Sequence, residues 1–191
     1  MFDQLRFLFR LTRAHGIARR YFVTNGFDGA LTMLGINMGF YTSGGVAVPV
    51  VISACLGAAV ALGVSGFASA YVSEVAERKK ELKELEQAVV RDLGDTAHGR
   101  AARLAPVIIA IVNGFSPFFI ALLIMTPLWF SQAGIGLPLS PLKSSIVIAF
   151  VVLFLLGVFL GTVSERFWLW SGLRMLLIAL LTAGMILMLG S

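Results

Sequence analysis

One acidic residue, Asp28, lies in a long apolar stretch of the sequence, where a carboxylate is costly. A charge at the centre of a membrane costs roughly a few kcal/mol or more unless it meets water, a cation or a proton. At helical spacing Asp28 shares a face with Tyr21, Thr24, Asn25 and Thr32. The pattern predicts a cation or proton site at Asp28, with Asn25 and Thr32 as further oxygen ligands. The alternative is an Asp that is protonated or paired with arginine and only locks helices together.

A second polar residue, Asn113, precedes Pro117 by four positions in another apolar stretch. Proline lacks a backbone N–H, so the carbonyl group of Asn113 would lose its helical partner. That carbonyl and the Asn113 side chain together could bind a cation. A proline kink that serves only helix packing is the alternative.

Four glutamates follow at steps of three, four and three residues: Glu74, Glu77, Glu81 and Glu84. This spacing places all four on one stripe of a helix. Glu77 and Glu81 form a like-charge pair, which costs roughly a few tenths of a kcal/mol unless a cation or protons relieve it. The stripe predicts a platform that collects divalent cations through oxygen ligands. The alternative is a solvated helix stabilised by the pairs Glu74 with Arg78 and Lys80 with Glu84.

Other residues that could bind metals or carry catalysis give weaker signals. Met33 and Met38 could be soft ligands, but in apolar segments methionine usually serves packing. Cys55 is the only cysteine, which excludes a disulfide or a cysteine-based metal site within one chain. The sequence has no nucleophile elbow, P-loop or dinucleotide loop. We therefore expect no enzyme and no prosthetic group.

The composition identifies the environment in which these residues must be positioned. Of 191 residues 58% are hydrophobic and only 13% charged, against roughly 25% charged in soluble domains. About 20 apolar residues suffice to cross a bilayer. The sequence predicts an all-α membrane protein with five transmembrane helices, at Tyr21–Tyr41, Val46–Ser73, Leu104–Phe130, Ser144–Val163 and Trp168–Leu189. The predicted regions are a cytoplasmic amphipathic segment 1–20, helices one and two in 21–73, a Glu-rich helical insert in the cytoplasm at 74–103, and helices three to five in 104–191.

The basic residues predict the topology. Of the 15 Lys and Arg, five precede the first helix and seven lie between the second and third. The positive-inside rule then puts the N-terminus in the cytoplasm and the C-terminus outside, in an integral protein of the cell membrane. The net charge of +5 is thereby explained without a nucleic-acid partner. Because 71–90 contains no Gly or Pro, the second helix should continue unbroken into the cytoplasm through at least Glu84, and 95–103 should link it to the third.

A short internal repeat is also present. Asn25-Gly26-Phe27 recurs as Asn113-Gly114-Phe115, and Val72-Ser73-Glu74 recurs as Val163-Ser164-Glu165. Both copies would begin on the same side, which predicts a parallel repeat about an axis along the membrane normal. Chance similarity in an apolar sequence is the alternative.

Three segments together resemble the vacuolar iron transporter family: RYFVTNGFDGALTMLG in the first predicted helix, SGFASAYVSEVAERKKELKELE in the second, and SGLRMLLIALLTAG in the last. The resemblance implies a homodimer with a pore between subunits, Asp28 as the pore carboxylate, and the Glu stripe as part of a metal-collecting domain. It also implies export of divalent metal from the cytosol, with proton antiport as the proposed coupling. Gly66 and Ala70 depart from the family, which carries Met and Glu there. The insert is also too short for the family's three-helix metal domain.

Two functions from different classes follow from these patterns. The first is an iron(II) or manganese(II) transporter in the lipid bilayer that exports metal from the cytoplasm, with metal ions and protons as its partners. The second is a membrane scaffold that does not transport and that docks a soluble partner on the Glu-rich helix.

Overall fold

The computed structural model describes residues 14–163 and 167–189, and within them every regular element is an α-helix. The helices are α2 (Ala14–Ser43), α3 (Val48–Val89), α4 (Ala97–Gln132), α5 (Pro141–Val163) and α6 (Trp168–Leu189). The all-helical class is thus confirmed. Most of the predicted amphipathic segment 1–20 lies outside the described residues, as do Ser164 and Glu165 of the repeat.

Four of the described helices, α3 to α6, are long and apolar enough to cross a membrane, judged by length and composition. Their outward faces carry many exposed large apolar side chains, for example Val64, Phe115 and Leu155. Such a surface needs lipid as its solvent, and the chain is an integral membrane protein. Helix α2 is more polar, because Asn25, Asp28 and Asn37 interrupt its apolar residues.

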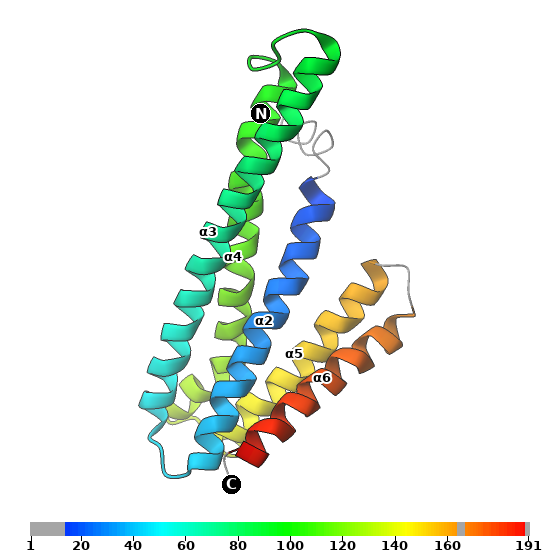
Figure 1. Ribbon diagram of the computed structural model, residues 1–191. Coiled ribbons are helices and arrows are strands. Elements are labelled where there is room, and N and C mark those ends of the chain that lie inside the picture. The colour runs from blue at the N-terminus through cyan, green and yellow to red at the C-terminus, as the bar shows by residue number, and fades with distance from the viewer. Residues whose placement is uncertain (1–13, 164–166, 190–191) are drawn as a thin grey trace.

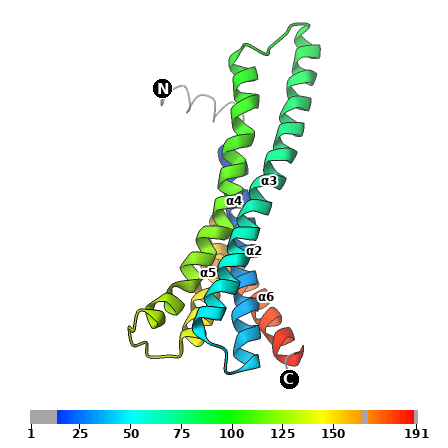
Figure 2. The ribbon, with the colours of Figure 1, turned by 90° about the vertical axis from the view of Figure 1, so that its left-hand side faces the viewer.

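Helix α2 contacts each of the four other helices. In Figure 1 it lies between the long antiparallel pair α3 and α4 and the shorter pair α5 and α6. Figure 2 shows the connected ends of α3 and α4 extending well beyond the other helices. We call residues 74–103 the α3–α4 hairpin.

Helix α3 is unbroken from Val48 to Val89, which confirms that it continues through Glu84. Gly44 and Gly45, with φ of 65° and 66°, form the turn before it, and its first turn contains Pro49. At about 1.5 Å per residue the helix is roughly 63 Å long. It ends where Val90 adopts a left-handed conformation, with φ of 51°.

Helix α4 begins earlier than its sequence suggests. Most of the predicted link 95–103 is helical, because α4 starts at Ala97 rather than near Leu104. Thr96 is its N-cap, and the Thr96 hydroxyl accepts a hydrogen bond from the backbone N–H of Gly99 at 3.5 Å. The N-cap marks the start of the helix. The pattern of apolar residues does not mark it, because polar residues interrupt that pattern in the first turns.

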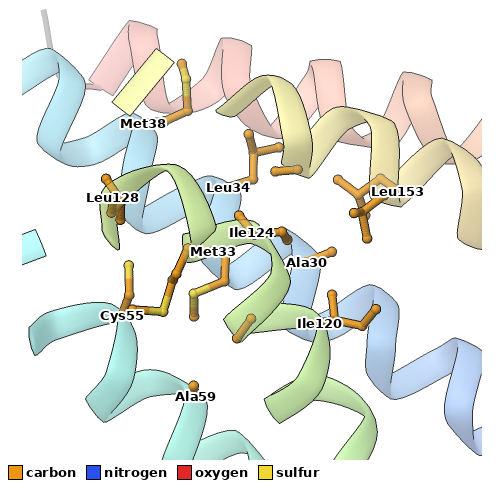
Figure 3. Packing of buried hydrophobic residues seen from close by; sticks show 14 of the residues in the cluster. Ala30, Met33, Leu34, Met38, Cys55, Ala59, Ile120, Ile124, Leu128 and Leu153 are labelled. Atoms are coloured by element: carbon orange, nitrogen blue, oxygen red, sulfur yellow. The ribbon is translucent and has the colours of Figure 1, made fainter. Parts of the chain in front are cut away.

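The apolar core joins all five described helices, with Ala179 and Ala183 contributed by α6, and Figure 3 shows part of it. Met33 of α2 is fully buried and lies near Cys55 of α3, and Leu34 of α2 and Leu153 of α5 belong to the same cluster. Met38 is also buried in this cluster. Met33 and Met38 therefore occupy core positions, in agreement with the packing interpretation.

Candidate metal site on helix α2

Asp28 lies near the middle of α2, and its side chain is exposed on the surface of the protomer. Thr24, one turn before it, is also exposed, and Thr32, one turn after it, is half-buried. Oγ1 of Thr32 donates a hydrogen bond to the backbone carbonyl of Asp28 at 2.8 Å. Thr24, Asp28 and Thr32 thus form a polar line along α2, and within the described residues the Asp28 carboxylate has no ion pair.

Neighbouring residues of α2 face other helices. A Cβ atom on Gly29 would lie 2.8 Å from Cα of Pro117, so this side of α2 touches α4. A Cβ atom on Gly35 would lie 3.8 Å from Cδ1 of Ile186, so a different side approaches α6. Asp28 lies about 100° of helix rotation from Gly29, on an arc that the described helices leave uncovered.

This placement has an energetic consequence. A carboxylate on the outer surface of a membrane bundle cannot face hydrocarbon in its charged form without a large cost. A cation, a proton, water or a second protein surface must therefore cover Asp28. In the described residues no three side chains of His, Cys, Asp or Glu gather as they would around a metal ion. One protomer thus supplies at Asp28 a single carboxylate with neighbouring hydroxyl groups.

Asn25 and Asn113 lie together, but their side chains bond each other. Nδ2 of Asn25 donates to Oδ1 of Asn113 and also to the carbonyl oxygen of Tyr21, at 3.2 Å in the second case. Nδ2 of Asn113 donates to the carbonyl oxygen of Gly66 at 2.6 Å. Asn113 is only 3% exposed. These bonds connect α2, α4 and α3 through one buried amide.

The backbone carbonyl freed by Pro117 is also covered. A Cβ atom on Gly66 would lie 3.1 Å from the Asn113 carbonyl oxygen, so that oxygen faces the α3 backbone. This arrangement favours the packing interpretation of Asn113 and Pro117. Gly66 and Ala70, where the family resemblance implies Met and Glu, are both buried in described helix α3.

The repeated Asn-Gly-Phe segments pack against each other. Besides the bond between Asn25 and Asn113, a Cβ atom on Gly26 would lie 3.0 Å from Oγ of Ser116. Oγ of Ser116 donates to the carbonyl oxygen of Phe22 at 2.5 Å. In the repeat, α2 corresponds to α4 and α3 corresponds to α5. A two-fold arrangement therefore requires that α5 pack on α2 as α3 packs on α4, and both contacts are present. The contacts agree with a real repeat.

The Glu stripe is divided by its packing. Glu74 is buried, and its Oε2 lies 3.4 Å from Nη2 of Arg78, which is buried as well. Nη1 of Arg78 donates to Oε2 of Glu81 at 2.6 Å. Arg78 and Glu81 line a pocket of about 90 Å³ that also contains His98 of α4. Glu74 and Arg78 are therefore covered by packing, whereas the Glu81 side chain remains 50% exposed.

Glu77 and Glu84, like Glu81, are on the surface. Glu77 is exposed, and Glu84 is exposed with its Oε1 4.0 Å from Nζ of Lys80. Both ion pairs of the solvated-helix alternative are thus observed, Glu74 with Arg78 and Lys80 with Glu84.

Other buried polar groups were not predicted as part of the site. Asn37 is fully buried; its Nδ2 donates to the carbonyl oxygen of Met33 at 2.8 Å, and its Oδ1 has no hydrogen-bond partner. Arg78 is buried with Nε unpaired. Ser116 is fully buried. For Asn37 the signal was available, because an amide inside an apolar helix is as unusual as Asp28.

Comparisons with known proteins identify relatives of this chain. The chain is 29% identical over 168 residues to the uncharacterized protein MJ0645 of Methanocaldococcus jannaschii, covering 86% of this chain and 84% of that protein. No solved structure matches. The sequence profile of the VIT family matches residues 79–191, more than half of the chain. The chain therefore belongs to the VIT family, the vacuolar iron transporters, which are membrane transporters of metal ions.

Proposed function

We propose that this protein is a homodimeric transporter of iron(II) or manganese(II) that exports metal from the cytoplasm in exchange for protons, with Asp28 as the pore ligand. The observation that carries the proposal is the exposed Asp28 carboxylate in the middle of α2. Membership of the VIT family supports metal-ion transport as the general activity.

A second copy would supply what one protomer lacks. If a two-fold axis passes beside α2, the two Asp28 carboxylates face each other and are removed from lipid. Two such carboxylates repel unless a cation or a proton lies between them. A divalent cation with oxygen ligands suits this arrangement, and protonation of one carboxylate would release the metal. Metal and proton would then compete for the same pair.

In this proposal α2 is the fifth transmembrane helix. Its polarity suits a helix that lines a pore, because Thr24, Asp28 and Thr32 offer oxygen atoms along one face. Consecutive residues of this line are about 6 Å apart along the helix axis. A cation that loses water could therefore pass from one set of oxygen atoms to the next.

The charge distribution supports the proposed orientation of the chain in the membrane. The start of α2 carries Arg19 and Arg20, and the α3–α4 hairpin carries seven Lys and Arg. By the positive-inside rule this end would face the cytoplasm. The cell membrane is part of the proposal. The exposed Glu77 and Glu84 would then attract cations near the entrance.

Flux measurements test the proposal. The purified protein is placed in liposomes that contain a manganese-sensitive dye, and manganese(II) uptake is followed with and without a pH gradient. Asp28→Asn keeps the shape and removes the charge, so we expect flux to fall to the level of empty liposomes. Asp95→Asn, a matched change in the link before α4, should leave flux unchanged. Normal flux through Asp28→Asn would refute the pore assignment, and a monomer in light scattering would refute the two-fold arrangement.

The scaffold function has one observation in its favour. The α3–α4 hairpin extends beyond the other helices, as Figure 2 shows, and its acidic residues include the exposed Glu77. Calorimetry with manganese(II) separates the two functions. A transporter should bind the metal with an affinity that Asp28→Asn lowers, whereas a scaffold should show no binding.

A further inference from the structure

A groove of about 380 Å³ lies between α3 and α4 on the side turned away from α2. Helix α4 contacts α2 through Asn113, Ser116 and Pro117. The groove is lined instead by residues such as Ile111 and Phe115, which lie about 200° around α4 from Asn113. It therefore opens on the face opposite to α2.

The floor of the groove is a close contact between two backbones. A Cβ atom on Gly114 would lie 2.5 Å from the carbonyl oxygen of Gly63, so neither helix has a side chain there. The rings of Phe67, Phe115 and Phe118 line its sides. All lining residues are apolar, and the volume falls within the range of about 300–1,000 Å³ typical of ligand pockets. The shape suits a linear apolar chain.

Toward the hairpin the same face becomes polar. Arg103 is two helical turns before Ile111, about 12 Å along α4, and it is exposed without an ion pair among the described residues. On α3 the exposed ring of Tyr71 stacks on Phe67, with centroids 6.2 Å apart. An amphipathic ring and a basic residue at this level match the headgroup region of a bilayer.

We propose that this groove binds an anionic phospholipid, with one acyl chain over Gly63 and Gly114 and the phosphate held by Arg103 and the Tyr71 hydroxyl. The free cation favours an anionic headgroup over a neutral one. A second copy of the chain is the competing occupant. If it were seated here, on the face opposite to α2, Asp28 would stay uncovered in both copies, at a large cost in lipid.

Native mass spectrometry of the whole protein in detergent tests the proposal, with dioleoyl phosphatidylglycerol and dioleoyl phosphatidylcholine as probes. We expect phosphatidylglycerol to bind more tightly. Arg103→Gln should weaken its binding about fivefold, the factor for the roughly 1 kcal/mol that one basic residue near the surface contributes. Arg91→Gln, an exposed arginine at the hairpin tip, is the matched control and should change nothing.

A second pair of variants tests the acyl-chain site. Val64 is 64% exposed at the groove, so Val64→Trp should fill the groove without disturbing the core and should weaken the binding of both lipids. Ile111→Trp should act in the same way if Val64→Trp does not fold. The control is Val147→Trp on the exposed face of α5. Unchanged lipid binding in both groove variants, or equal binding of the two lipids to the native chain, would overturn the proposal. So would a change in the number of subunits on filling the groove, because the occupant would then be a second copy.

Discussion

Nδ2 of Asn25 in α2 donates a hydrogen bond to Oδ1 of Asn113 in α4, 88 residues away in the sequence. Nδ2 of Asn113 also donates a hydrogen bond to the carbonyl oxygen of Gly66 in α3. One buried amide thus joins three helices, within one turn of Asp28 on α2. Any change to this amide should affect the whole bundle.

Asn113→Ala should destabilise the protein, because it leaves the Gly66 carbonyl and the Asn25 amide without these partners. We expect a loss of about 1–2 kcal/mol, which lowers Tm by roughly 2–8 °C for a chain of this size. Thermal unfolding in detergent measures it. Thr182→Ala removes a hydroxyl that bonds only its own helix, and it should change Tm little. Equal effects of the two changes would contradict the bridging role.

Gly114→Ala should destabilise the crossing of α3 and α4. Its Cβ atom would lie 2.5 Å from the carbonyl oxygen of Gly63, so the two backbones must separate. Gly57→Ala on α3 is the matched control, because nothing lies within 4 Å of its Cβ position. That change should stabilise the helix by about 0.5–1 kcal/mol. Opposite signs in chemical denaturation are expected, and a stabilising Gly114→Ala would refute the close contact.

Arg78→Met should unfold the base of the α3–α4 hairpin, since it leaves the buried carboxylate of Glu74 without its cation. Breaking such a buried pair costs about 3 kcal/mol or more. Adding Glu74→Leu should recover most of the loss, because the unpaired charge is then removed. Lys80→Met breaks a pair whose side chains are 70% and 63% exposed and should cost under about 0.5 kcal/mol. Hydrogen exchange across the hairpin measures the stability of all three variants. If Arg78→Met destabilised the hairpin no more than Lys80→Met, the Glu74–Arg78 pair would not be buried.

Glu77→Gln and Glu81→Gln should differ in stability although both relieve the same like-charge pair. Glu81 accepts a hydrogen bond from Arg78 at 2.6 Å, so its neutralisation should cost about 1 kcal/mol. Glu77 is exposed and outside that network, and its change should stay within about 0.5 kcal/mol of the native chain. Denaturant titration without metal compares them, and a larger loss from Glu77→Gln would be the contrary result.

The local features of the fold follow closely from the sequence. The last helix was predicted at Trp168–Leu189 and is observed there, because an apolar run of this length has no other stable form in lipid. The exposed polar line of Asp28 also follows from spacing within one helix. The periodicity of one helix does not show which neighbouring helix packs against each of its faces. Glu74 shares a stripe with Glu81, yet it is buried because α4 is a neighbour there.

In the candidate site too, the residue types could be predicted from the sequence, but their contacts between helices could not. Asn25 and Asn113 were both predicted as ligands from their own surroundings, and each is an unusual residue in an apolar helix. Their mutual bond depends on the packing of α2 on α4, which no local pattern contains. Gly66 was visible only as a missing side chain. A Cβ atom at this position would lie 3.1 Å from the Asn113 carbonyl oxygen, so a larger residue there requires α3 and α4 to move apart.

Cys55 gives the protein a built-in reporter. It is the only cysteine of the chain and is fully buried in the core between α2 and α4. A maleimide reagent cannot reach its thiol while the helices remain packed, so the rate of alkylation measures how often the core opens. The rate can be followed in native membranes, without detergent or chemical denaturant. Variants such as Gly114→Ala can thus be ranked by alkylation in the bilayer itself.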